Sequence, residues 1–310
     1  MPTEISQSET DPSSSSSSLR QQRQHQPAGR RIGFDEAREI LQKWREENAR
    51  CPEKVRDLWI HCLSKCKSLG DERWLIVEQV AMAGMDLHDT SLIKECLSIL
   101  ESKFPKSSRV RRLKVMANVE MRERYEEALK TYDAMIKKDE ANSILYKRKI
   151  AILIAQKRTP EIIKELSEYL KKFMNDTEAW LELCDVYIQD QAYSKAAFCM
   201  EELIITNPHN HLYHQRFAEI QYTIGTTESL ELARSYFAQA VKLNPSNLRA
   251  LYGLQLTAYT LSNQPRTVSQ KKKENAKISA WATTQITKLY QESNEKSLPV
   301  VESMMANLQL

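Results

Sequence analysis

Three histidines and two cysteines are the residues of this chain whose types and spacing could hold a metal ion. His209, His211 and His214 occur in the run HNHLYH, and imidazole nitrogens are common zinc ligands. Cys62 and Cys66 lie about one helical turn apart in HCLSKC, so their thiolates could chelate one ion. No Cys or carboxylate directly adjoins the histidines, however, and the cysteines have no second pair. The spacing therefore favours packing roles for these side chains, and we predict no metal site.

The short motifs that carry enzymatic chemistry are absent from the chain. It lacks the phosphate-binding patterns G-x-x-x-x-G-K-[ST] and G-x-G-x-x-G, the metalloprotease pattern H-E-x-x-H and the nucleophile pattern G-x-S-x-G. Glu and Lys are spread over every predicted helix, where they normally form a solvated face, so no acid–base pair can be singled out. We predict a protein that is not an enzyme, with no catalytic residues and no cofactor.

The charge balance gives no case for a nucleic-acid partner or for direct binding to an anionic membrane. The 310 residues include 45 Lys and Arg against 41 Asp and Glu, a formal net charge of +4. The densest basic run, QKKKENAK, is expected at the exposed start of a helix. Contact with a membrane surface or an acidic partner is the alternative for this run.

The cysteines and the hydropathy pattern favour a soluble protein that faces the cytosol. Six cysteines occur without a C-x-x-C, which is typical of free thiols in a reducing compartment. The N-terminus is polar and lacks the apolar segment of a secretory signal. No run reaches the roughly 18 apolar residues that a bilayer-spanning helix needs.

Composition and periodicity divide the chain into three parts. Residues 1–32 contain SSSSSS and RQQRQHQP, which cannot bury enough apolar surface to offset the entropy of ordering, so we expect a disordered tail. Residues 33–292 show helical periodicity, interrupted by short breaks such as TNPHN and LNPSN. Residues 293–310 form a linker and a short apolar helix, which is expected to cap the last hairpin or to dock onto a partner.

One spacing of apolar residues recurs in RYEEALKTYDAM, AYSKAAFCMEEL and SLELARSYFAQAV. A small residue is followed four positions later by a large apolar residue, and three positions after that by another apolar residue. The small residue lets two paired helices approach closely, and the large residue fills the gap between hairpins. A proline after the second helix prevents its continuation. The pattern assigns packing roles to Ala128, Tyr132, Trp180, Leu183, Tyr187, Ala196, Met200, Pro208, Ala233, Phe237, Ala240 and Pro245.

This pattern has a constant period along the chain. Ala128 and Ala196 are separated by two periods, and Ala233 follows with a three-residue insertion placed in GTTES. Helix–turn–helix units of about 34 residues are the signature of the tetratricopeptide repeat, and WLELCDVY matches its first helix with Cys184 at the glycine position. In the fourth hairpin, Ile163 is assigned to the position of the small residue. We predict an all-α superhelical solenoid of about seven hairpins with a C-terminal capping helix. The hairpins are expected near residues 34–70, 72–105, 109–141, 143–175, 177–210, 211–247 and 248–291.

The first helix of each pair lines the concave surface in this architecture, and aromatic and aliphatic residues there favour a protein partner. Co-chaperones of this class that grip a C-terminal carboxylate use Lys, Arg and Asn at these positions, so that clamp is not expected. Packing within the same hairpin is the alternative for some of the residues. The predicted partner-binding residues are Leu113, Ala117, Leu181, Asp185, Gln215, Glu219, Tyr222, Tyr252, Leu256 and Tyr259.

The chain resembles the family of endoplasmic reticulum membrane protein complex subunit 2 in the run AWLELCDVYIQDQAYSKAAFCMEELIITNPHNHLYHQRFAEIQYTIG. The segments ARSYFAQAVKLNPSNLRALYGL, WATTQITKLYQ and DLWIHCLSKCKSLGDERWLIVEQVAMAGMDLHD fit the same family, so the similarity covers about residues 34–292. The resemblance implies a peripheral scaffold on the cytosolic side of the endoplasmic reticulum membrane. Its implied partners are membrane-embedded insertase subunits and a cytosolic subunit, in a complex that inserts transmembrane segments.

Two other classes of helical repeat protein remain open from the sequence. The α-subunit of a protein prenyltransferase also repeats hairpins, but it needs recurrent Trp-x-x-Arg pairs, and Trp180 is followed by Leu181, Glu182 and Leu183. A general tetratricopeptide adaptor or an RNA-processing scaffold is the other alternative, and the latter predicts nuclear signals and a basic face that are not evident.

The repeat register is tested by enlarging one small residue. Ala196→Trp should force two paired helices apart and lower stability by several kcal/mol, because overpacking costs roughly 1–3 kcal/mol even for modest enlargements. In a repeat array the damage should extend mainly to the neighbouring hairpins. Thermal unfolding is the measurement, and an unchanged melting temperature would show that the register is wrong.

Overall fold

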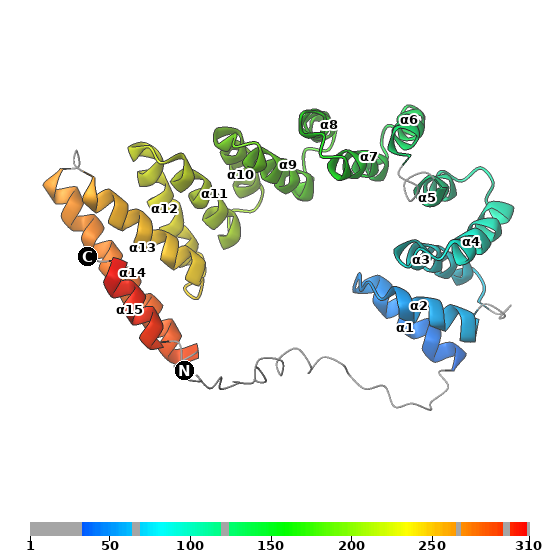
Figure 1. Ribbon diagram of the computed structural model, residues 1–310, viewed down its shortest axis with the longest axis horizontal. Helices are drawn as coiled ribbons and strands as arrows, with labels where there is room; N and C mark the ends of the chain where they lie inside the picture. Colours follow the sequence, from blue (N-terminus) through cyan, green and yellow to red (C-terminus); the bar gives the residue numbers. More distant parts are fainter. Residues whose placement is uncertain (1–32, 64–68, 119–123, 265–267, 294–297, 309–310) are drawn as a thin grey trace, which may run out of the picture. The chain divides into compact units, whose positions relative to one another are not determined.

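The computed structural model describes residues 33–63, 69–118, 124–264, 268–293 and 298–308, which form helices and no strands (Figure 1). The tail of residues 1–32 and the thiol of Cys66 therefore lie outside the described residues, and the predictions made for them stay predictions. The chain divides into two compact units, Met1–Met121 and Arg122–Leu310, which we call unit 1 and unit 2.

Unit 1 consists of short paired helices joined by tight turns. Pro52 occupies the first turn of its helix, where a missing N–H is tolerated, and the Asp89 carboxylate accepts hydrogen bonds from the backbone N–H groups of Ser91 and Leu92. The helices are α1 (Phe34–Glu46), α2 (Pro52–Leu58) with its π-helical continuation η1 (Trp59–Leu63), α3 (Glu72–Asp86), α4 (Thr90–Lys103) and α5 (Ser108–Asn118).

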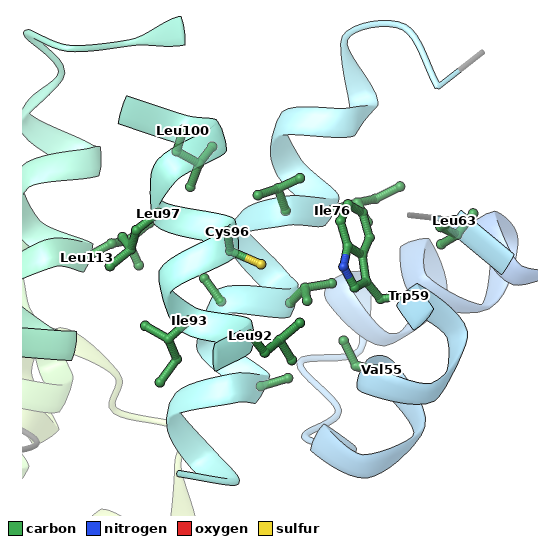
Figure 2. Close-up of a cluster of buried hydrophobic side chains, with 14 of the residues drawn as sticks. Val55, Trp59, Leu63, Ile76, Leu92, Ile93, Cys96, Leu97, Leu100 and Leu113 are labelled. Atoms are coloured by element: carbon green, nitrogen blue, oxygen red, sulfur yellow. The ribbon is translucent and has the colours of Figure 1, made fainter. Parts of the chain in front are cut away.

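A single apolar cluster holds unit 1 together (Figure 2). Trp59 is 2 % exposed and packs among residues of α2, α3 and α4, while Leu113 of α5 joins the cluster beside Leu97. Burial raises the pKa of Cys96 to about 12, so this thiol is a packing group. An ion pair of Arg109 with Glu78 also ties α5 to α3.

Unit 2 contains the remaining helices, and consecutive helices pack against each other. The turn inside each hairpin falls at a regular point. The residues that follow the first helix with positive φ are Lys157, Gln191 and Gly225, which are separated by one repeat period each. The helices are α6 (Tyr125–Ile136), α7 (Ser143–Ala155), α8 (Thr159–Lys172), α9 (Thr177–Gln189), α10 (Tyr193–Thr206), α11 (His211–Ile224), α12 (Thr227–Leu243), α13 (Leu248–Asn263), α14 (Ser269–Ser293) and α15 (Leu298–Leu308).

Most residues that the repeat pattern assigns to packing are buried, and the others lie at helix borders. Trp180 and Tyr187 are half-buried, and Pro208 and Pro245 are exposed just after α10 and α12. The residues with at most 4 % exposure are Ala128, Tyr132, Leu183, Ala196, Met200, Ala233, Phe237 and Ala240.

One detail of the predicted register is wrong. The small-residue position of the fourth hairpin is Ile162, which lies one repeat period from both Ala128 and Ala196 and is 4 % exposed. Ile163, which was assigned to this position, is half-buried on the neighbouring side of α8. The structure therefore places a large aliphatic side chain where the other hairpins hold alanine.

The residues at positions 180 and 214 show how side-chain chemistry is repeated along with the helices. The indole Nε1 of Trp180 donates to the carbonyl oxygen of Met174 at 2.8 Å. The Nε2 of His214, one period later, lies 2.8 Å from the carbonyl oxygen of Pro208, and its ring stacks on Tyr236. In both repeats, a ring nitrogen in the first helix binds a carbonyl of the loop that enters this helix.

The last helix, α15, covers α14. Val301 is 7 % exposed and belongs to the same apolar cluster as Ala282 and Ile286 of α14. Val300 and Met304 remain exposed. The side chains of Met305 and Leu308 lie outside the described residues.

Gly253 provides a second test of the packing. A Cβ built at this position of α13 clashes with the ring of Phe237, which is 2 % exposed on α12. Gly253→Ala should lower stability by about 1–3 kcal/mol, although alanine is the better helix former. The expected drop in the melting temperature is roughly 2–12 °C.

The matched control is Gly33→Ala, because a Cβ at Gly33 meets no atom within 4 Å. If the two variants melt at the same temperature, α12 and α13 do not approach as closely as described.

Candidate partner-binding groove

A groove in unit 2 is bordered by α9, α10, α11 and α13, and we call it the aromatic groove. Its volume is 440 Å³. It is lined by Ile188, Tyr193, Arg216, Glu219, Ile220, Tyr222, Thr223, Arg249, Tyr252, Gly253 and Leu256.

The repeat itself brings these side chains together. Ile188 and Tyr222 occupy equivalent positions, one repeat period apart, in the first helices α9 and α11. Glu219 and Leu256 are equivalent in α11 and α13, with the three-residue insertion between them. Residues at one repeat position face the same way in stacked hairpins, so they form one continuous wall.

The aromatic side chains of the groove differ in how freely they can contact a partner. Tyr222 is 37 % exposed, so its ring offers contact area. Tyr252 is half-buried, and both desolvation and a hydrogen bond with Tyr290 of α14 raise its pKa. Tyr252 therefore belongs to the fixed floor of the groove, whereas Tyr222 stands on its rim.

A chain of ion pairs crosses the groove from α9 to α13. The Asp185 carboxylate accepts from Nη2 of Arg216 at 2.8 Å, and Arg216 Nη1 lies 3.8 Å from Glu219 Oε2. Arg249 donates to both oxygens of Glu219, at 2.5 and 3.1 Å. Exposed ion pairs contribute little each, but a linked series fixes the long side chains in one arrangement. The arginines thus form a polar rim around an apolar floor.

Helix α9, which borders the aromatic groove, also lines a second pocket of 990 Å³. We call it the acidic pocket, because Glu178, Glu182 and Asp185 lie on its α9 side. It is lined by Lys147, Ile154, Lys157, Thr159, Ile162, Glu178, Ala179, Glu182, Asp185, Val186 and Gln189.

Lys147 is held at the edge of the acidic pocket by two carboxylates. Its Nζ lies 2.8 Å from Asp176 and 2.9 Å from Glu178. Desolvation acts to lower the pKa of Lys147, but these contacts outweigh it and the net pKa is raised. Asp176 in turn caps α9 through the N–H of Ala179 and accepts from the Tyr169 hydroxyl at 2.6 Å. Desolvation acts to raise the pKa of Asp176, and the three donors lower it overall.

The predicted partner-binding residues separate into two groups. Glu219, Tyr222, Tyr252 and Leu256 line the aromatic groove, and Asp185 lines the acidic pocket. The first four lie together in one groove, and Asp185 is linked to that groove through its ion pair with Arg216.

The other five predicted residues line neither pocket, as the structure describes them. Leu113 and Ala117 of α5 are buried within unit 1, so they offer a partner little contact area there. Gln215 is 7 % exposed, and its side-chain oxygen accepts from Asn247 at 2.8 Å. Leu181 is 36 % exposed and Tyr259 is half-buried.

Sequence reasoning missed the charged residues Arg216, Arg249 and Glu182. Glu182 and Arg216 are equivalent positions of successive repeats, and each directly follows a predicted residue, Leu181 or Gln215. The signal that could have found them is a polar stripe on α9, in which Glu178, Glu182 and Asp185 follow at i, i+4 and i+7.

The histidines of HNHLYH are engaged in separate contacts. His209 is exposed, and His211 bridges Asn244 and Asn247 at 3.1 and 2.9 Å. His214 is buried against Tyr236. Within the described part of the chain, no three His, Cys, Asp or Glu side chains come together in a way that could hold a metal ion.

Comparison with known proteins identifies the repeat and the family. A family model described as the EMC2 TPR-like repeat domain matches residues 97–236. ER membrane protein complex subunit 2 of Xenopus tropicalis is 44 % identical over 286 residues, which cover 90 % of this chain and 96 % of that protein. The Dictyostelium discoideum protein of the same name is 32 % identical over 71 % of each chain.

Solved structures show the same fold at low identity. The C-terminal part of a TPR repeat-containing protein from Cytophaga hutchinsonii superposes with a TM-score of 0.54 at 15 % identity, covering 86 % of this chain and 98 % of that one. At this identity the likeness concerns the fold alone.

The contacts of Asp176 generate a pH-dependent prediction. Its pKa is lowered in the folded protein, so its stabilising contribution is present above the unfolded value of about 3.9 and is lost as the pH falls through the folded pKa. Asp176→Asn keeps a capping side chain but loses the charge that Lys147 faces. It should cost about 1–2 kcal/mol at pH 7 and less below pH 4.

Thermal melts of both proteins between pH 2 and 7 measure this difference. A gap in melting temperature that stays constant down to pH 2 would contradict the role given to the carboxylate.

Proposed function

The chain belongs to the family of ER membrane protein complex subunit 2, and on this premise we propose that it is a non-enzymatic scaffold on the cytosolic side of that complex. It supports the insertion of transmembrane segments, including tail anchors and segments of multispanning proteins, by holding other subunits in place. Its partners are membrane-embedded insertase subunits and a cytosolic subunit.

The aromatic groove is the observation that carries the proposal. Tyr222 and Leu256 present apolar surface between arginines, without any of the catalytic motifs searched for in the sequence. Aromatic side chains surrounded by a polar rim are the usual centre of a protein–protein interface, since they bury a large area at low entropic cost. The groove therefore suits a polypeptide partner.

Attachment to the membrane is proposed to occur through those partners. Within the described residues, no helix combines the length and the apolar character that crossing a bilayer requires. One basic residue of α14 is already paired within the chain, because Lys271 forms an ion pair with Glu231 of α12 at 2.7 Å. The family membership supports a proposed peripheral position on the endoplasmic reticulum membrane.

The groove is tested by removing its apolar contacts. Tyr222→Ala combined with Leu256→Ala should release the membrane-embedded partners during purification in mild detergent, because truncation of a central interface residue often costs about 2 kcal/mol. Levels of tail-anchored and multispanning clients should fall in cells that carry only this variant.

The matched control is Phe198→Ala combined with Ile205→Ala. These residues are 52 % and 75 % exposed on α10, and neither lines the groove. The proposal expects this variant to keep its partners. Retention by the groove variant and loss by the control would place binding on the other face.

Peripheral attachment is tested by fractionation. The protein should sediment with endoplasmic reticulum membranes and be released by alkaline carbonate, since carbonate strips proteins that are held only by other proteins. Retention in the carbonate pellet, or soluble behaviour in cells with intact partners, contradicts the proposal.

A further inference from the structure

Glu182 is placed between two neutralised carboxylates but is not neutralised itself. On α9, Glu178 pairs with Lys147 at 2.9 Å and Asp185 pairs with Arg216 at 2.8 Å. Among the described residues, no hydrogen bond or ion pair reaches Glu182. Its side chain lines the acidic pocket, and desolvation raises its pKa. Glu182, in the middle of the stripe, thus has no cation in direct contact.

This arrangement brings the free protein no evident benefit. Like charges three and four residues apart on a helix destabilise it. Lys147 and Arg216 pair with the two ends of the stripe, and Lys147 also attracts Glu182 from a distance, but no cation contacts Glu182 directly. Glu182 is exposed in the free protein, and a bound molecule that places a positive charge there would exclude water and so strengthen the attraction.

The unpaired carboxylate lies on the same helix as one residue of the aromatic groove. Glu182 lines the acidic pocket and Ile188 lines the aromatic groove, both on α9. Given the helical rise, the two positions are about 9 Å apart along the helix. The two positions also differ by about 120° around the helix, so a bound chain that crosses α9 could contact both.

We propose that the acidic pocket and the aromatic groove together hold one segment of a partner protein. This segment places a Lys or Arg against Glu182 in the pocket and an apolar side chain beside Tyr222 and Leu256 in the groove. Such a segment would complement both the charge of Glu182 and the apolar surface of the aromatic groove. This inference rests on the proposed function, and it names the chemistry of the partner that the groove accepts.

Charge reversal at this position has opposite consequences for the free protein and for the complex. Glu182→Lys should leave the melting temperature of the free protein unchanged or raise it, because the new ammonium lies one turn from Glu178 and Asp185. In cells that carry only this variant, the amount of membrane partner retained in mild detergent should fall about tenfold or more. Glu182→Gln, which removes the charge without reversing it, should give an intermediate loss.

The matched control is Glu201→Lys, which reverses an exposed carboxylate on α10 outside both pockets. It should keep its partners. If Glu182→Lys also keeps its partners while the Tyr222 and Leu256 truncations lose them, the groove binds a partner, but that partner places no cation against Glu182. If the truncations keep them as well, the proposed groove function fails. If Glu182→Lys melts at a lower temperature than the unchanged protein, the Glu182→Gln variant provides the test. Full retention of the membrane partner by that variant overturns the inference.

Discussion

Close contact between the two helices of a hairpin is the constraint on which unit 2 depends. Ala196 and Ala233 occupy the same repeat position in α10 and α12 and have no exposed surface, whereas α8 accommodates Ile162 at this position. At Gly253 of α13, an added Cβ would clash with the ring of Phe237. Because each hairpin contacts mainly its neighbours, these local contacts also fix how successive first helices align.

The groove is a consequence of that alignment. Equivalent positions in α9, α11 and α13 form a single wall, so an aromatic floor and a chain of ion pairs arise from residues far apart in sequence. The polar contacts divide into two kinds. Lys147, Asp176 and Tyr169 tie α7, α8 and α9 together within the fold. Glu182 forms no hydrogen bond or ion pair among the described residues, so its charge is available to a partner.

Much of the fold could be predicted from the sequence, because the constant repeat spacing determines both the hairpins and the helices that follow each other. The all-helical solenoid was expected, and its helices begin and end close to the predicted breaks. The candidate site was only partly predictable. Glu219, Tyr222 and Leu256 were found by register alone, but the burial of Gln215 depends on its hydrogen bond with Asn247 of the next hairpin, which no single repeat reveals. The shift from Ile163 to Ile162 shows how an error of one residue moves a side chain out of the core.

Hydroxyl-radical footprinting of the free protein and of the intact complex tests the central claim most directly, because it reports the solvent access of individual side chains. The account predicts that modification of Tyr222 and Leu256 falls several-fold on assembly, while Phe198 and Ile205 on α10 remain as reactive as in the free protein. Protection of Phe198 and Ile205 with unchanged reactivity at Tyr222 and Leu256 would contradict it.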